Sequence, residues 1–223
     1  MKTMKIRNWI YLGLGGVLGA WMASCGGGTF CHAQQTLIHV PLPPGTTLNH
    51  SGTLIRDFTG VVVTYYSPET NLETFDVARL GAAKETVDLA AFSLTDAAIV
   101  NALVADAGRG VKIRIYLDRG ELQAECRGDA TCARIPLHNL LDLPGVTVKV
   151  KFSKVLMHLK SYEIDGMLVR DGSANFSEQG ESRQDNSATF TSDLIAAAAF
   201  ETKFEEIWAR ADNLTVAEGI KAK

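Results

Sequence analysis

The sequence predicts a single α/β domain, built as a mixed β-sheet flanked by helices on both faces. Short β-branched or aromatic segments alternate with segments whose apolar residues recur at helical spacing, which is typical of α/β sandwiches. Hydrophobic residues make up 46% of the 223 residues and charged residues 21%, as in an ordinary globular domain, which excludes a disordered chain. We find no internal repeat and no low-complexity linker, so one domain is the simplest organisation.

The first 33 residues have the pattern of an export signal. A basic start, MKTMKIRN, precedes the apolar run WIYLGLGGVLGAWMA, which is shorter than a membrane span requires. Cleavage after Ala33 would leave a mature chain that begins at Gln34 and has no membrane span. The sequence MASC, which ends at Cys25, resembles a lipobox and offers a lipoprotein as the alternative. A retained N-terminal anchor is the third possibility.

Cysteine parity favours the first of these alternatives. Cleavage after Ala33 removes Cys25 and Cys31 and leaves Cys126 and Cys132, an even number for an oxidising compartment. Lipid attachment at Cys25 would instead leave Cys31 as an odd thiol. We therefore expect an exported protein, periplasmic or secreted, with a disulfide between Cys126 and Cys132 that has no catalytic role.

The mature chain divides by composition. Residues 34–58 are polar and rich in proline, so they are predicted to form an extended segment ahead of the fold. The alternating pattern occupies residues 59–212, and residues 213–223 are predicted to be a C-terminal tail.

Seven segments have the character of strands. Residues 111–117, VKIRIYL, alternate strictly between apolar and polar side chains. The pair Asp165-Gly166 predicts a hairpin turn between the two segments that flank it. The predicted strands, in chain order, are residues 61–66, 87–93, 111–117, 146–152, 156–164, 167–170 and 186–190.

Four segments have the character of helices. The pair Thr95-Asp96 starts one of them, and Gly108 marks its end. Ser192 is the predicted cap of the last helix, whose apolar residues from Leu194 to Trp208 recur at helical spacing. The predicted helices, in chain order, are residues 72–84, 95–108, 135–141 and 193–211.

One group of spaced residues between 158 and 175 has the residue types of an active site. In the run HLKSYEIDGMLVRDGSAN, His158 and Lys160 are two residues apart on a predicted strand, so their side chains are expected on one face. Asp165 follows after four residues, and the run GSAN (172–175) follows after six more. This pattern is HxK-x4-D-x6-GSxN, and it resembles the signature of the phospholipase D superfamily.

The resemblance covers roughly residues 60–210, including the runs YYSPE and NFSEQGESRQDN. The chain is most similar to the compact, exported bacterial endonucleases of this superfamily, which carry a single motif, and it is more distantly similar to a mitochondrial single-motif nuclease. The resemblance implies the phospholipase D-like fold and phosphodiester hydrolysis without metal or cofactor. Since the chain holds one motif, the resemblance also implies a homodimer in which two subunits complete one site.

The residue types suit an attack on a phosphodiester. Its negative charge must be neutralised, which Lys160 can do as a point charge and Ser173 and Asn175 by hydrogen bonds. Gly172 allows the backbone to approach the phosphate closely. The neutral imidazole of His158 can attack phosphorus and form a phosphohistidine. The acid that protonates the leaving oxygen would be the histidine of the second subunit, as the resemblance implies.

Three further polar residues near the motif have predicted roles. Asp165 either belongs only to the Asp-Gly turn or orients the site electrostatically as a catalytic residue. The resemblance places a carboxylate about ten residues beyond Asn175, where it supports the histidine; Asp185 is the best match, with a surface position as the alternative. Asn186 would then be a supporting hydrogen-bond donor to the substrate.

Charge indicates where a polyanion could bind. The first 33 residues hold three basic residues and no acid, so the formal net charge of −3 for the chain becomes −6 for residues 34–223. This excludes a generally basic surface, and any polyanion site must be local. Between residues 143 and 162 lie Lys149, Lys151, Lys154 and Lys160, without an acid. They are predicted to form a substrate-binding stripe, with a solvated strand face as the alternative.

Together these features predict an exported endonuclease that hydrolyses nucleic-acid phosphodiester bonds, DNA or RNA. The histidines and cysteines have no metal-ligand spacing, so neither a metal nor another cofactor is expected. A phospholipase D-type hydrolase of phospholipid head groups is the alternative, and an inactive binding protein is the second alternative.

Overall fold

The computed structural model describes residues 60–222 and four short stretches before them, 9–10, 40–41, 46–48 and 54–56. It divides into two units, Met1–Phe58 and Thr59–Lys223. In the first unit, two pairs of short strands are antiparallel: β1 (Trp9–Ile10) with β2 (Val40–Pro41), and β3 (Thr46–Leu48) with β4 (Leu54–Arg56). The cleavage and lipidation sites predicted around Ala33 and Cys25 lie outside the described residues.

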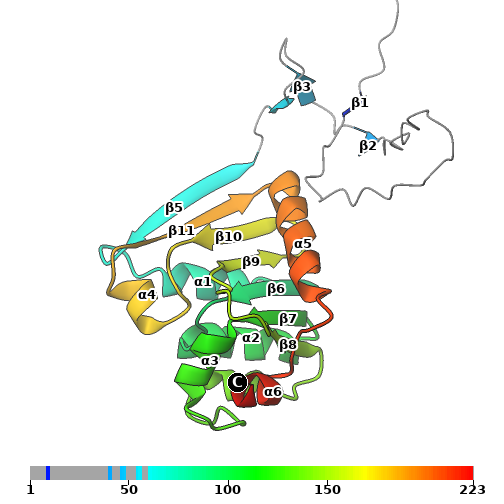
Figure 1. Ribbon diagram of the computed structural model, residues 1–223. Coiled ribbons are helices and arrows are strands. Elements are labelled where there is room, and N and C mark those ends of the chain that lie inside the picture. The colour runs from blue at the N-terminus through cyan, green and yellow to red at the C-terminus, as the bar shows by residue number, and fades with distance from the viewer. Residues whose placement is uncertain (1–8, 11–39, 42–45, 49–53, 57–59, 223) are drawn as a thin grey trace, which may run out of the picture. The chain divides into compact units, whose positions relative to one another are not determined.

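A seven-stranded mixed sheet forms the body of the second unit (Figure 1). The strand order is β5-β11-β10-β9-β6-β7-β8; the neighbours among β6, β7 and β8 are parallel, and the other neighbours are antiparallel. All seven predicted strands are present. They are β5 (Val61–Ser67), β6 (Thr86–Ala91), β7 (Lys112–Leu117), β8 (Val146–Val150), β9 (Lys160–Ile164), β10 (Leu168–Gly172) and β11 (Asn186–Ser192).

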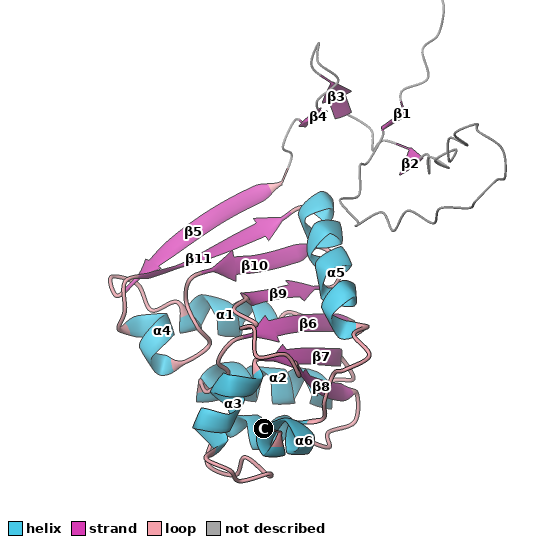
Figure 2. Ribbon diagram, viewed as in Figure 1, coloured by secondary structure: helices cyan, strands magenta, loops and turns pink. Residues whose placement is uncertain are grey.

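Helices cover both faces of this sheet, which confirms the predicted fold class (Figure 2). Helices α1 (Glu73–Leu80) and α2 (Ala97–Gly108) lie on one face, and α5 (Leu194–Trp208) lies on the other. The shorter helices are α3 (Arg119–Cys126), the 3-10 helix η1 (Pro136–Leu140), α4 (Glu178–Ser182) and α6 (Val216–Lys221). No helix of the described residues is long and apolar enough to cross a membrane.

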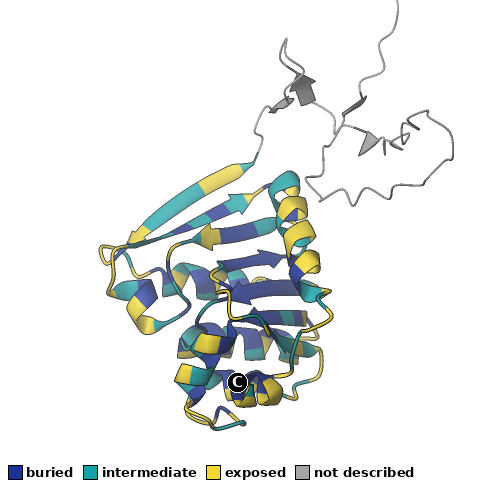
Figure 3. Cartoon of the chain, in the orientation of Figure 1, coloured by how far each residue is buried: buried dark blue, intermediate teal, exposed yellow. Residues whose placement is uncertain are grey.

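The alternation of side chains along β6 divides the core. Val87 and Leu89 point into the larger core, which also contains apolar side chains of α1 and α2. Ala90 points to the other face, where it packs with Tyr116 and with Phe204 of α5. Strand β6 is therefore buried on both faces, and Figure 3 shows the buried residues concentrated in the central strands.

Strand β9 starts later than predicted, and this changes the position of the motif. It begins at Lys160, so His158 precedes the strand, and the predicted sharing of one strand face by these two residues is wrong. The cause is Asp118, whose Oδ2 accepts the backbone N–H of Met157 at 2.8 Å. This bond holds the chain before His158 as a loop.

The last long helix also differs at its start. Ser192 is the final residue of β11, and Asp193, not Ser192, is the cap of α5. The Asp193 Oδ1 accepts the backbone N–H groups of Ile195 and Ala196 at 3.0 and 2.9 Å. The carboxylate satisfies amides that the helix itself leaves free, which explains the preference for Asp at this place.

The predicted C-terminal tail is part of the folded domain. Helix α6 begins with a capping box formed by Thr215 and Glu218, and its residues Val216 and Ile220 are buried. Gln123 of α3 donates through Nε2 to the carbonyls of Gly219 and Ala222 at 2.8 and 2.7 Å. The boundary predicted at residue 212 is therefore wrong, because residues 213–222 cover the end of the sheet.

The predicted disulfide is confirmed, since Cys126 and Cys132 are bonded and both are buried. Cys126 is the last residue of α3, a helix that the sequence analysis did not predict. Asp118 caps this helix through a hydrogen bond from the Glu121 N–H at 3.0 Å.

We predict that Gly219→Ala destabilises the domain. A Cβ at Gly219 would lie 2.8 Å from Val150 Cγ1, so α6 must move away from β8. We expect a loss of about 1–3 kcal/mol, the usual cost of overpacking, measured by thermal unfolding of the full chain.

Gly108→Ala is the matched control, because nothing lies within 4 Å of a Cβ at this residue of α2. Alanine also favours the helix, so the control should raise stability or leave it unchanged. An unchanged melting temperature for Gly219→Ala would contradict the packing of α6 described above.

Candidate active site

The two halves of the motif meet at one edge of the sheet. Lys160 is the first residue of β9, and Gly172 is the last residue of the antiparallel strand β10. Lys160 also lies opposite Ala91, the last residue of β6. Residues 158–160 and 172–175, which are separated in the sequence, are therefore neighbours at this edge.

Phe92, which directly follows β6, contacts the first half of the motif. The exposed His158 ring lies edge-on to the Phe92 ring, with 4.7 Å between the centroids. Lys160 Nζ lies 4.9 Å from the centroid of the same ring and donates to the His158 carbonyl at 2.8 Å. Lys160 is only 5% exposed, and burial, followed by the positive charge of Arg170, lowers the pKa of its ammonium group.

The second half of the motif is fixed by close backbone contact. Gly172 has a φ of +154°, and a Cβ there would lie 2.2 Å from the Ser187 carbonyl oxygen, so only glycine fits. Ser173 Oγ donates to Asn186 Oδ1 at 2.9 Å and accepts the Ser187 N–H at 3.0 Å. Asn175 Oδ1 is buried and accepts no hydrogen bond from the described residues, and Asn175 Nδ2, the group that can donate to a phosphate, has no hydrogen-bond partner among them either.

Asp185 and Asn186 lie beside Ser173. They line an open cavity of about 310 Å³ together with Tyr66, Ser67, Glu69, Ser173 and Ser187. Asn186 donates through Nδ2 to the Gly180 carbonyl at 3.1 Å, which fixes the oxygen that accepts from Ser173. Asp185 is exposed and makes no hydrogen bond or ion pair with His158 among the described residues.

The family follows from a comparison with known proteins. Residues 77–208 match a family model described as the PLD-like domain of cardiolipin synthase. The chain belongs to the phospholipase D superfamily. This confirms the family predicted from the motif, and the motif lies within the matched residues.

Two solved structures have the same fold. NucT from Helicobacter pylori superposes with a TM-score of 0.59 at 19% identity, over 67% of this chain and 96% of that one. Nuc from Salmonella typhimurium, a phospholipase D family member, gives a TM-score of 0.58 at 22% identity, over 70% and 99%.

Curated relatives are similar over shorter shares of their length. A mitochondrial cardiolipin hydrolase of Chlamydomonas reinhardtii is 28% identical over 144 residues, which are 65% of this chain and 60% of the relative. A phospholipase D of Rickettsia conorii is 28% identical over 141 residues, which are 62% of this chain and 65% of the relative. The chain thus covers less than two thirds of the length of either relative.

The structure does not bring Asp165 to the phospholipase D-type motif. This residue follows β9 at the end opposite Lys160, about 16 Å away at the rise of an extended strand. Its carboxylate accepts the backbone N–H groups of residues 84–86 at 2.8–2.9 Å. Although partial burial opposes the shift, these three donors hold the pKa of Asp165 below its ordinary value. Asp165 therefore shapes the turn, and an electrostatic effect of its charge on the site stays a prediction.

The predicted lysine stripe is not continuous. Lys149 Nζ donates to the Trp208 carbonyl at 3.0 Å and lies over the Trp208 ring, on the face covered by α5. Lys151 is 8% exposed and donates to the Leu156 carbonyl at 3.3 Å. Lys154 is exposed and is the one member of the predicted set that combines exposure with no hydrogen bond to the described residues.

Sequence reasoning missed two residues that position His158. Phe92 contacts its ring, and Asp118 holds the amide of Met157 next to it. Asp118 had a recognisable signal, because an Asp directly after the strand 111–117 is a typical helix cap. Phe92 had none, since an aromatic residue at a strand end is usually part of the core.

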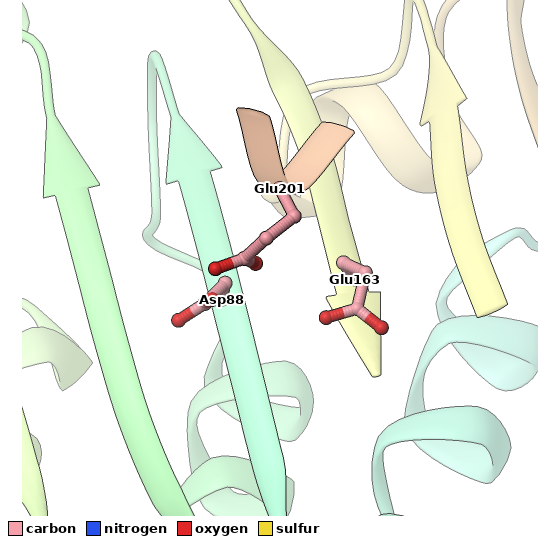
Figure 4. Close-up of side chains that lie close together, drawn as sticks. All are labelled: Asp88, Glu163 and Glu201. Atoms are coloured by element: carbon pink, nitrogen blue, oxygen red, sulfur yellow. The ribbon is translucent and has the colours of Figure 1, made fainter. Parts of the chain in front are cut away.

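Three carboxylates outside the motif come close enough together to hold a metal ion. Asp88, Glu163 and Glu201 extend from β6, β9 and α5, and one oxygen of each lies within 4.8 Å of the others (Figure 4). Arg114 already supplies positive charge there, with hydrogen bonds to Asp88 at 2.5 and 2.7 Å and to Glu201 at 3.2 Å. Burial raises the pKa of Glu163 to about 7. These residues lie under α5, apart from the motif.

We predict that Asp165→Asn destabilises the domain and leaves the site unchanged. Asn tolerates the left-handed backbone at φ 55°, but it loses the charge and one acceptor oxygen for the three N–H groups. We expect a loss of about 1.5–3 kcal/mol at pH 7 by denaturant unfolding. Since the pKa of Asp165 is lowered by folding, the difference between wild type and variant should shrink as the pH falls through that pKa.

Asp142→Asn is the matched control, because Asp142 also has a positive φ of 66° but is exposed and makes no side-chain hydrogen bond with the described residues. The NMR chemical shifts of the His158 ring at pH 7 should be the same in both variants and in the wild type. A change of these chemical shifts in Asp165→Asn alone would support an electrostatic role for Asp165 at the site.

Proposed function

We propose that this protein is a metal-independent phosphodiesterase that cleaves nucleic acid through a phosphohistidine intermediate. The observation that carries the proposal is the convergence of the exposed His158, the buried Lys160 and the uncommitted Asn175 amide at one sheet edge. This arrangement offers a nucleophile, a cation and hydrogen-bond donors to one phosphate.

The reaction follows in two displacements. A neutral ring nitrogen of His158 attacks phosphorus, the bond to the leaving oxygen breaks, and an acid protonates that oxygen. Water then attacks the phosphohistidine, the P–N bond breaks, and the imidazole is released. Lys160 and the N–H groups of the Asn175 side chain stabilise the charge on the phosphoryl oxygens in both steps, and Ser173 can donate to them once its hydroxyl hydrogen turns away from Asn186 Oδ1. Burial of Lys160 strengthens its attraction for the phosphate.

The openness of the site supports a polymeric substrate. His158 is exposed at a sheet edge, and the cavity beside Ser173 is lined mainly by polar side chains. A nucleic-acid backbone can pass across such an edge and leave on both sides. Lys154, on the loop before His158, is positioned to contact a neighbouring phosphate.

One observation favours the lipid alternative. Val155 and Leu156 are 73% and 58% exposed, and they lie on the loop directly before His158, with the exposed Phe152. Exposed apolar residues next to a phosphodiester site would suit a protein that works at a membrane surface. A direct comparison of substrates therefore tests the proposal.

The purified full chain should cleave single-stranded DNA, double-stranded DNA or RNA in the presence of millimolar EDTA, and it should leave phosphatidylcholine and cardiolipin vesicles intact. His158→Ala and Lys160→Ala should each lower kcat at least about 1,000-fold, because each removes a group that acts on the phosphate. His138→Ala and Lys112→Ala, which replace exposed residues outside the site, are the matched controls.

Three results would contradict the proposal. Loss of activity with EDTA and recovery with Mg²⁺ would exclude the mechanism. Turnover of vesicles alone would establish the lipid hydrolase, and binding of nucleic acid without turnover of any substrate would establish an inactive binding protein.

We also propose that the working unit is an exported homodimer with one composite site. The chain supplies one motif histidine, whereas the two displacements need a nucleophile and a separate proton donor. In a closed two-fold dimer identical surfaces meet, so His158 of one subunit can attack while the partner's His158 protonates the leaving oxygen.

Mixing tests this dimer. Equal amounts of wild-type and His158→Ala chains, allowed to exchange, should retain about one quarter of the activity of the same total amount of wild type, because about a quarter of randomly formed dimers are fully wild type. Independent sites would retain about half. A fully active monomer in light scattering would exclude the composite site.

A further inference from the structure

A single arginine lies between the two halves of the motif. Arg170, on β10, is fully buried and is the largest of the fully buried side chains. Its Nη1 donates to the carbonyl of Lys160 at 2.5 Å and to the carbonyl of Ala174 at 3.0 Å. Lys160 belongs to the HxK half, and Ala174 lies between Ser173 and Asn175 of the GSxN half. One guanidinium therefore holds the backbone of both.

The position of these bonds matters because β9 and β10 separate there. Their ladder ends at the pair Arg170–Tyr162. Beyond that pair, Lys160 follows β6, where it lies opposite Ala91, while Gly172 follows β11, where it lies opposite Ala188. The site is thus built where two strands diverge.

Two side-chain links span the divergence. On one face of the sheet Ser161 Oγ donates to Asp171 Oδ1 at 2.7 Å, and on the other face Arg170 makes its pair of bonds. The arginine differs from the serine link because it reaches the backbone of the motif residues themselves.

The arginine is itself held by two buried carboxylates. Its Nη2 donates to Asp76 Oδ2 of α1 at 3.3 Å and to Glu181 Oε1 of α4 at 3.1 Å. Tyr162 donates to the other Asp76 oxygen at 2.8 Å. Burial, and then the negative charge of Asp76, raises the pKa of Glu181. With Glu181 protonated, this buried group holds one positive charge on Arg170 and one negative charge on Asp76, so it is neutral overall.

We propose that Arg170 is a positioning residue for phosphodiester cleavage, which sets the separation of the HxK and GSxN halves and orients Lys160 toward the substrate. This inference rests on the function proposed above. The charge of Arg170 should also act on Lys160 directly, since the Arg170 guanidinium holds the Lys160 carbonyl. The Lys160 pKa is lowered first by burial and then by Arg170, whereas Glu121 and Asp118 raise it.

The test separates positioning from stability by comparing variants with a remote core variant. Arg170→Met removes both the bonds and the charge, and Arg170→Lys keeps the charge but loses the forked geometry. Leu103→Ala, in the core under α2, is the stability control, because it creates a cavity far along the chain from the motif. Rates are measured on the full chain, well below each melting temperature, from pH 5 to pH 10.

Arg170→Met should lower kcat at least about tenfold with a much smaller change in KM, because misplaced groups weaken the transition state more than binding. Its loss of activity at high pH, which follows deprotonation of Lys160, should move to higher pH because a neighbouring positive charge is gone. Arg170→Lys should also lower kcat, but it should lose activity at the same high pH as the wild type. Leu103→Ala should lower the stability but leave kcat and the pH at which activity is lost unchanged.

The carboxylates provide a second pair of variants. Glu181→Gln imitates a protonated glutamate, so kcat should stay within about twofold of wild type. Asp76→Asn removes the charge that balances Arg170 and should lower kcat and stability together. Equal effects of these two substitutions would contradict the charge arrangement.

The proposal would be overturned if Arg170→Met had the same kcat as Leu103→Ala and lost activity at the same high pH. If Arg170→Met does not fold, wild-type kcat in Arg170→Lys overturns it equally. Titration of the Lys160 ammonium by NMR distinguishes this inference from the proposed function, because it requires no turnover. An unchanged Lys160 titration in Arg170→Met, or in Asp76→Asn if the former is unfolded, would exclude electrostatic action by this group.

Discussion

A positive charge sealed inside the core imposes the strongest constraint on this fold. The Arg170 guanidinium has no route to water, and such a group is tolerated only where acceptors and a counter-charge surround it. Asp76 and Glu181 meet this need from α1 and α4, which are about a hundred residues apart in the chain. Helix α4 is five residues long and could not persist alone, so the pairing of Glu181 with Arg170 helps to hold it in place. The same charge thereby fixes two helices and both halves of the motif.

Three of the cations near the site lie beneath its surface. Lys160, Lys151 and Arg119 are all nearly buried around the loop that carries His158, although residues 34–223 have a net charge of −6. A buried cation acts through a medium of low dielectric, so its field reaches a bound anion with little screening. This explains how a mainly acidic chain can present a site suited to an anion without a basic surface.

The strands and the family could be predicted because they depend on local patterns. Short β-branched, aromatic or alternating runs located all seven strands, and the spacing of six residues identified the motif. The short helices α3, α4 and α6 were missed because they are polar and brief, and contacts from distant residues stabilise them, such as those of Gln123 with the end of the chain. Asp165 illustrates a different limit. A fixed spacing in the motif does not reveal that β9 carries Lys160 and Asp165 to opposite ends of the sheet.

Strand order has a consequence for how the chain acquires its structure. Among the described residues the first strand of the sheet, β5, pairs only with the last, β11, and Thr64 bonds to Thr189 at a sequence separation of 125. Contacts of such high contact order form late and slow folding, since a long loop must close first. During synthesis β5 leaves the ribosome first, and its partner β11 follows only when nearly the whole domain has been made. Until then β5 is unpaired, and its residues Val61 and Val62 are exposed. The pairing of β5 with β11 is therefore among the last steps that complete this sheet.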